Sequence, residues 1–263
     1  DYDTLDYKDV SEAKRYEELL VDPIEFWKQR YPNQSIFRFI VTHPDMDHLT
    51  GLYRLVEQEG IPIFNLWDTE HDKDFSESDF DGSIYDYRDW ETYRNLAGSS
   101  NSNTLYLKRG SEGQYWLEDG ITILSPTDEL TQTARENDDY NISSYVLLIK
   151  HGNSVVLLGG DADNEHAWPD IYDHVPGELL SQVVLLKASH HGRKSGYHQP
   201  SIKLMSPKYT IVSVGKKPDT DASSLYAQYS EVYSTRYHGT ITARCWHDGD
   251  VWLYDHEGNR IDA

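Results

Sequence analysis

Residues 39–48 read FIVTHPDMDH, an apolar run that ends in two histidines and two aspartates within six positions. Residues 35–41 have the composition of a buried strand, and leucines recur at helical spacing over residues 49–55 until Gly60 ends the pattern. The four polar side chains are therefore expected on a strand-to-helix loop. Bringing imidazoles and carboxylates together costs desolvation and carboxylate repulsion unless a cation neutralises them. The loop predicts a site for a divalent metal ion.

The composition is that of a single large domain. The chain has 263 residues, of which 38% are hydrophobic, enough to bury a sizeable core. Cys245 is the only cysteine, which excludes a disulfide framework and multi-cysteine zinc sites and leaves His and carboxylate groups as metal ligands. This cysteine usage fits a reducing compartment, so we expect a cytoplasmic protein. No apolar run approaches the ~20 residues that cross a bilayer, and no membrane partner is expected.

The chain is strongly acidic. It has 45 Asp and Glu against 24 Lys and Arg, and its formal net charge is −21 at pH 7. This charge disfavours non-specific binding to a polyanion, and a solubilising surface is its simplest explanation. Two bound divalent ions would nevertheless supply about four positive charges where a phosphate would bind. An acidic surface is thus compatible with a phosphate-binding site.

Short apolar runs predict most of the secondary structure. Strands are expected at residues 35–41, 61–66, 105–108, 114–117, 121–124, 144–150, 154–158, 183–187, 210–214, 240–246 and 251–254. Helices are expected at residues 11–20, 23–30 and 128–139. Residues 1–34 form a helical N-terminal segment without a core strand, and residues 67–103, rich in acidic and aromatic side chains, are interpreted as an insertion or lid.

Side chains of the types that bind metal ions stand at the ends of separate strands. One set lies in the 43–48 loop, Asp161 follows a second strand, and His190 and His191 follow a third. Asn141 precedes a further strand. Strand ends form a rigid frame on which loop side chains converge. We therefore expect these groups to assemble one site.

The loop resembles the HxHxDH motif of the metallo-β-lactamase superfamily, with Asp45 in place of the middle histidine. With NISS at 141–144, GGDA at 159–162 and ASHHG at 188–192, it is similar to the branch that contains the nuclease domain of ComEC competence proteins and its stand-alone relatives. This resemblance implies an α/β fold, the αββα four-layer sandwich, in a single domain of residues 1–263. The first strands of that fold have no counterpart in residues 1–34. We expect them to be lacking, or to be supplied by a missing segment or a protein partner.

The resemblance also implies two divalent metal ions between the sheets. The residues that it assigns are His43, Asp45 and Asn141 to one ion, Asp47, His48 and either His190 or His191 to the other, and Asp161 to a bridging position. Oxygen ligands such as Asp45 favour manganese or magnesium over an all-histidine zinc site; manganese is expected first and zinc second. Two ions roughly 3.5–4 Å apart lower the pKa of a bridging water, so the nucleophile would be hydroxide, with Asp47 and Asp161 as catalytic residues.

Candidate substrate contacts follow the histidine pair. Arg193 and Lys194 could clamp a phosphate and Ser195 could donate a hydrogen bond to it, although a solvated basic pair explains the two cations nearly as well. An aromatic lid from Trp67 to Trp90 could stack bases, and core packing explains these aromatic residues equally well.

These features favour a metal-dependent phosphodiesterase, a nuclease that cleaves DNA or RNA. Two alternatives stay open. One is a hydrolase of small phosphodiesters or other esters, which the net charge of −21 and a lid would suit. The other is a non-catalytic regulatory or binding subunit on the same fold, which the abrupt N-terminus would suit and the intact ligand set argues against.

Overall fold

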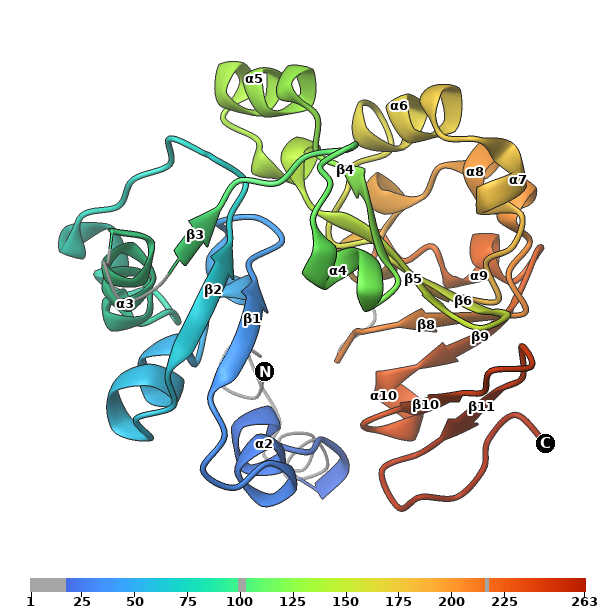
Figure 1. The fold of residues 1–263 in the computed structure, drawn as a ribbon, viewed down its shortest axis with the longest axis horizontal. Helices are drawn as coiled ribbons and strands as arrows, with labels where there is room; N and C mark the ends of the chain where they lie inside the picture. The colour runs from blue at the N-terminus through green and yellow to red at the C-terminus, as the bar shows by residue number, and fades with distance from the viewer. Residues whose placement is uncertain (1–17, 99–102, 216–217) are drawn as a thin grey trace.

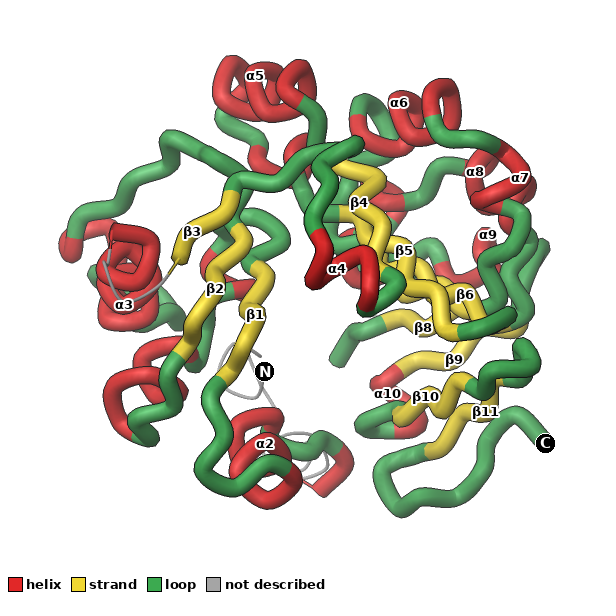
Figure 2. The backbone as a smooth tube through the Cα atoms, viewed as in Figure 1, coloured by secondary structure: helices red, strands yellow, loops and turns green. Residues whose placement is uncertain are grey.

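The strands lie in the interior of the protein and most helices lie at its periphery (Figures 1 and 2). The computed structural model describes residues 18–98, 103–215 and 218–263. Within these ranges the strands form sheets of three, six and two strands. The mixed α/β class that we expected is confirmed. None of the helices in these ranges combines the length and apolar character needed to traverse a bilayer.

The smaller sheet carries the 43–48 loop. It is parallel, and its strands are β1 (Ile36–Ile40), β2 (Ile63–Trp67) and β3 (Asn103–Leu105). One face packs against the π-helical segment η2 (Arg54–Gln58) and α3 (Tyr87–Gly98), and Leu66, Trp90 and Tyr93 are buried there. Because β1 is held by its neighbour in the sheet and by this apolar layer, the loop that follows it starts from a fixed point.

The larger sheet carries the remaining ligands. Its strands, in order, are β4 (Ile121–Ser125), β5 (Val146–His151), β6 (Ser154–Leu158), β7 (Leu185–Lys187), β8 (Tyr209–Val212) and β9 (Glu231–Ser234). The first three pair antiparallel and the last four pair parallel. One face is covered by α5 (Asp128–Asn137), α6 (Ala167–His174), α7 (Gly177–Leu180), α8 (Gln199–Met205) and α9 (Ser223–Tyr226).

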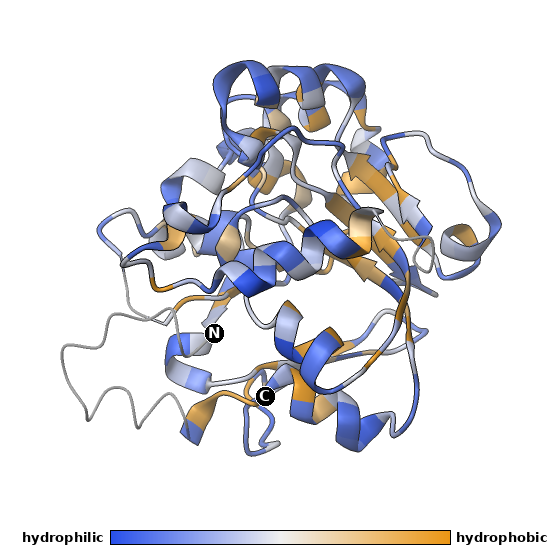
Figure 3. Cartoon of the chain, turned by 90° about the vertical axis from the view of Figure 1, so that its left-hand side faces the viewer, coloured by the Kyte–Doolittle hydropathy of each residue, from blue (hydrophilic) through white to orange (hydrophobic). Residues whose placement is uncertain are grey.

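The two sheets pack against each other through their inner faces. Along β5, Leu148 lies in the layer under the helices, whereas Leu147 faces Trp67 of the smaller sheet, as strand alternation requires. The hairpin of β10 (Thr242–Cys245) and β11 (Val251–Tyr254) covers the other part of the same inner face. The order is therefore helices, sheet, sheet, helices, with apolar strands inside and polar helices outside (Figure 3).

Most of the expected elements are present, with α2 (Pro23–Arg30) at the predicted bounds and capped by Asp22. The strand predicted at 114–117 is wrong, because these residues form α4 (Gln114–Glu118). Only Trp116 contacts the core, against Trp67, while Tyr115 and Leu117 are 63% and 53% exposed, so no alternating face is buried. Strand β9 and the helices α3, α6 to α9 and α10 (Thr235–His238) were not predicted.

Two predictions concern segments that the structure describes in part. The helix expected at 11–20 lies mostly outside the described residues, and β1 is the first strand within them. The 67–103 segment contains the short helix η3 (Glu77–Phe80) and α3, whose Trp90 belongs to the core of the smaller sheet.

Candidate metal centre

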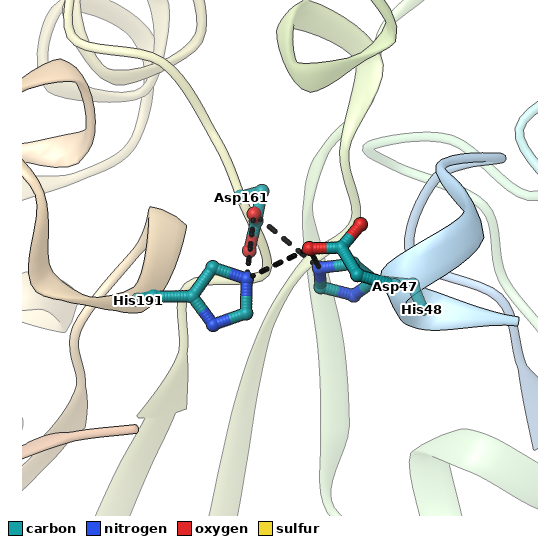
Figure 4. Close-up of side chains that lie close together, drawn as sticks. All are labelled: Asp47, His48, Asp161 and His191. Carbon is teal, nitrogen blue, oxygen red and sulfur yellow. Dashed lines mark ion pairs between the residues drawn. The ribbon is translucent and has the colours of Figure 1, made fainter. Parts of the chain in front are cut away.

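Four side chains from three loops converge where the two sheets meet. They are Asp47, His48, Asp161 and His191, and their donor atoms all lie within 4.8 Å of one another (Figure 4). The Nε2 atoms of His48 and His191 are 3.3 and 3.4 Å from Asp161 Oδ2, and 3.9 and 3.3 Å from Asp47 Oδ2. Ligands about 2.0–2.2 Å from a tetrahedral ion are roughly 3.3–3.6 Å apart. The spacing fits one metal ion.

Two of these donor atoms have unmet bonding capacity. His48 Nε2 and His191 Nε2 are buried, and neither makes a hydrogen bond of acceptable geometry with the described residues. Leaving a buried polar atom unsatisfied costs about 1–3 kcal/mol, so such atoms are rare without a function. A metal ion would use both lone pairs and neutralise the two carboxylates. We therefore identify this four-residue group as a candidate metal centre.

The charges of the group support the same assignment. Burial raises the pKa of Asp161, but the neighbouring imidazoles of His191 and His48 outweigh this effect and hold that pKa well below its usual range. Burial likewise raises the pKa of Asp47, and His191 and His48 again lower it overall. For His191, burial lowers the pKa, but Asp161 and Asp47 raise it to about 9. Without an ion, an imidazolium therefore offsets the carboxylates at neutral pH.

Thr42 orients two of the imidazoles. Its Oγ1 lies 3.1 Å from His43 Nδ1 and 3.2 Å from His48 Nδ1, at the start of the loop that follows β1. A hydroxyl can donate to one nitrogen and accept from the other, so both rings are held with Nε2 directed away from Thr42. Thr42 was not among the predicted site residues, although its place beside His43 was a usable signal.

Asp161 is positioned by close contact between loops of the larger sheet. Its backbone N–H donates to Ser144 Oγ over 2.9 Å. The preceding Gly160 has φ of 51°, and a Cβ there would stand 2.5 Å from both Ser144 Oγ and Tyr145 O. Only glycine fits this approach. The Gly160 carbonyl also accepts from His190 N–H, which ties this loop to the histidine pair.

The backbone decides between the two consecutive histidines. His190 and His191 have φ of 48° and 55° within the short helix η5 (His190–Gly192), a left-handed conformation that is costly for residues with a Cβ. His191 joins the candidate metal centre, whereas His190 Nδ1 lies 2.8 Å from Ser195 Oγ. Of the two ligand candidates that the sequence left open, the structure brings His191 into the group and leaves His190 beside it.

His43 and Asp45 lie next to the candidate metal centre but do not complete a second group of the same kind within the described residues. The His43 ring is 4.2 Å from the His48 ring, and its Nε2 is 3.6 Å from Asp45 Oδ2. Asp45 Oδ1 is 2.5 Å from Lys73 Nζ. Burial raises the pKa of Asp45, but His43 and then Lys73 hold it well below its usual range.

Asn141, predicted as a ligand of the first ion, stands at the start of η4 (Tyr140–Ser143). Its Oδ1 is buried without a hydrogen-bond partner, while its Nδ2 donates to Asp139 Oδ1. None of its hydrogen bonds reaches His43 or Asp45. The structure therefore does not join Asn141 to these two residues, although an unused acceptor remains on it.

An open cavity of about 280 Å³ lies beside the centre. It is lined by Asp45, Met46, Asp47, Phe75, Asp79, Phe80, Ser83 and Tyr85. Trp67 and Trp90, at the two ends of the segment that was expected to form an aromatic lid, are both 1% exposed and belong to the core. Phe75, Phe80 and Tyr85 supply the aromatic surface of the cavity instead.

The basic pair lies on the surface near this cavity. Arg193, Lys194 and Ser195 are exposed, and neither cation forms an ion pair with a described residue. Burial and the charges of Asp47 and Asp45 raise the pKa of Tyr85, whereas Arg193 lowers it, so the Arg193 charge acts at the cavity. Ser195 is engaged by His190.

Comparison of the chain with protein-family models, curated proteins and solved structures found no match.

Proposed function

We propose that this protein is a metal-dependent phosphodiesterase of the metallo-β-lactamase type that cleaves nucleic acid, with DNA as the first expected substrate. The observation that carries the proposal is the convergence of Asp47, His48, Asp161 and His191, of which Asp47 also lines an open cavity. The order of helices and sheets, with the site at strand ends between them, agrees with the sequence resemblance.

The donor set suits a divalent ion held by two imidazole nitrogens and two carboxylate oxygens. Manganese and zinc both accept such ligands, and the oxygen content favours manganese. When bound, the ion would polarise a phosphoryl oxygen and make water a stronger nucleophile at neutral pH. Asp47 and Asp161 would hold it, and the Thr42 hydroxyl orients the His48 ring for the same role.

The residues around the centre could attract a phosphate, transfer a proton and stack a base. Arg193, whose charge acts at the cavity, can attract a phosphate into otherwise acidic surroundings. Burial lowers the pKa of His190, so its imidazole is neutral at pH 7. Because Ser195 engages Nδ1 and no described residue bonds Nε2, His190 is suited to transfer a proton beside the centre. Phe75, Phe80 and Tyr85 provide faces on which a base can stack.

The test is cleavage by metal-stripped protein after addition of manganese, magnesium or zinc. Substrates are single- and double-stranded DNA, RNA and a chromogenic phosphodiester. We expect manganese-dependent cleavage of a polymer, abolished by Asp161→Ala and retained by His174→Ala, a matched control at an exposed histidine. Protein that binds the ion and cleaves none of the four substrates would contradict the proposal and leave a non-catalytic subunit.

A second candidate is hydrolysis of small phosphodiesters. The cavity is small, about 280 Å³, and the net charge of −21 repels a long polyanion. Turnover of the chromogenic phosphodiester without cleavage of any polymer would favour this candidate over the nuclease.

A further inference from the structure

Lys73 is an unusual lysine because its ammonium is directed into the protein. It stands between β2 and η3, and its side chain is only 19% exposed. Its Nζ lies 2.5 Å from Asp45 Oδ1, on a carboxylate that the sequence assigned to a metal ion. The two residues are 28 positions apart, so the contact depends on how the intervening chain folds.

The backbone around Lys73 is anchored on both sides. Its N–H donates to Nδ1 of His71, which is itself buried with Nε2 2.6 Å from the Tyr93 hydroxyl. The neighbouring Asp72 accepts a hydrogen bond of 2.8 Å from the Tyr140 hydroxyl. These hydrogen bonds therefore fix the turn that carries Lys73 and position its side chain beside Asp45.

Aromatic rings hold the ammonium as well. Lys73 Nζ is 5.1 Å from the centre of the Phe75 ring and 5.2 Å from that of Tyr140, distances at which a cation is attracted to a ring face. A carboxylate and two rings thus surround one positive charge. This is a binding site for a cation, and the chain supplies the cation.

A metal ion bound by His43 and Asp45 would meet this charge. Asp45 Oδ2 is 3.6 Å from His43 Nε2, while Oδ1 is already paired with Lys73. An ion shared with that carboxylate would stand within a few ångströms of the ammonium, and the two positive charges would repel each other.

No lysine or arginine among the described residues forms an ion pair with Asp47 or Asp161. The charge of the buried Lys187 acts on Asp161 and His191, but its Nζ donates to the Ala188 carbonyl and not to a carboxylate of the centre.

We propose that Lys73 is a tethered cation that takes the place of a second metal ion. The protein then holds one divalent ion at the Asp47, His48, Asp161 and His191 centre, and a second ion binds at His43 and Asp45 only after Lys73 withdraws. This inference rests on the proposed metal-dependent function, which supplies the first ion. It differs from the sequence-based prediction in having one bound ion in place of two.

The experiment is a manganese titration of the metal-stripped protein, followed by equilibrium dialysis and by the electron paramagnetic resonance spectrum of bound ions. The wild type should bind one equivalent tightly and show the spectrum of an isolated ion. Lys73→Met should bind the second equivalent at least about tenfold more tightly and show coupled ions. Lys73→Arg, which keeps the charge, should behave as the wild type.

Lys108→Met is the matched control, because Lys108 pairs with Glu70 of the same segment and does not touch Asp45. It should leave the stoichiometry at one. Two equivalents of similar affinity in the wild type would overturn the inference, as would a second site unchanged in Lys73→Met. Two equivalents of similar affinity in the wild type overturn the inference even if Lys73→Met does not fold.

Failure of the proposed function gives a different result. A wild type that binds one ion and cleaves nothing contradicts the phosphodiesterase and supports the role of Lys73. A wild type that binds two ions and cleaves DNA does the reverse, and one that binds no ion contradicts both.

Discussion

The two halves of the 43–48 loop neutralise their charge in opposite ways. Asp47 and His48 join a group in which two imidazole nitrogens are buried without hydrogen-bond partners. Asp45, two residues earlier, is already paired with an ammonium that the chain brings from 28 positions away. A run of potential ligands in sequence therefore does not fix how many ions bind, because a side chain from elsewhere can supply the positive charge.

The largest effect should separate the two consecutive histidines. His191→Ala removes one of four donors, so manganese affinity should fall by at least about 100-fold in equilibrium dialysis. His190→Ala removes a residue outside the group and should leave the affinity within about threefold of the wild type, since its ring contacts Ser195. Equal losses in the two variants would mean that the group is not the binding site.

The pH dependence of metal binding should be nearly as large. In metal-free protein the pKa of His191 is raised to about 9, so its proton must leave before the nitrogen binds an ion. Affinity should increase about tenfold per pH unit from 7 and level off above pH 9. Calorimetry in buffers of different ionisation enthalpy should show release of one proton at pH 7.5. No proton release would contradict the protonated state.

The raised pKa of His191 also predicts that the metal-free protein becomes less stable as pH rises. A raised histidine pKa stabilises the folded state below its unfolded value near 6.5, and that stability is lost as pH rises through about 9. The metal-free protein should therefore melt at a lower temperature at pH 9.5 than at pH 7. Saturating manganese should reduce this difference.

Removal of the shared hydroxyl tests how the two halves are linked. Thr42→Val keeps the size of the side chain but leaves the Nδ1 atoms of His43 and His48 without their partner. Affinity for the first ion should fall by about tenfold, because a ligand that is no longer oriented binds less well. Thr133→Val, which removes a hydroxyl that donates to the Glu129 carbonyl within α5, is the control.

The smallest effect concerns the cavity that both halves border. Phe80→Ala should raise the KM for a DNA substrate by about fivefold through loss of base stacking, with manganese affinity unchanged. Phe37→Ala, at an exposed aromatic residue of β1 outside the cavity lining, should change neither quantity. A KM unaffected by Phe80→Ala would place the substrate elsewhere.

The sequence predicted the centre better than its surroundings. Asp47, His48 and Asp161 were predictable because each follows an apolar strand, and such ends meet between the sheets. The choice of His191 over His190 was not, since it depends on two left-handed backbone conformations. Lys73 gave no signal, because its segment has no periodicity and its contact with Asp45 requires the folded turn.

The same reasoning explains the errors in the fold. A five-residue run such as α4 is too short to distinguish a period of 2 from one of 3.6, and its aromatic composition favoured a strand. Strand β9 (Glu231–Ser234) was missed because no residue of it is fully buried, so it lacks the apolar run that marked its neighbours. Strands β5 and β6 were unambiguous because they are continuous apolar runs with mostly buried residues.

The origin of the four ligands has a mechanical consequence. Asp47 and His48 extend from the smaller sheet, whereas Asp161 and His191 extend from the larger one (Figure 4). An ion at their centre would link the two sheets, and its binding free energy would add to the free energy needed to separate them. Chelation should accordingly speed proteolysis and amide hydrogen exchange along the seam between Trp67 and Leu147.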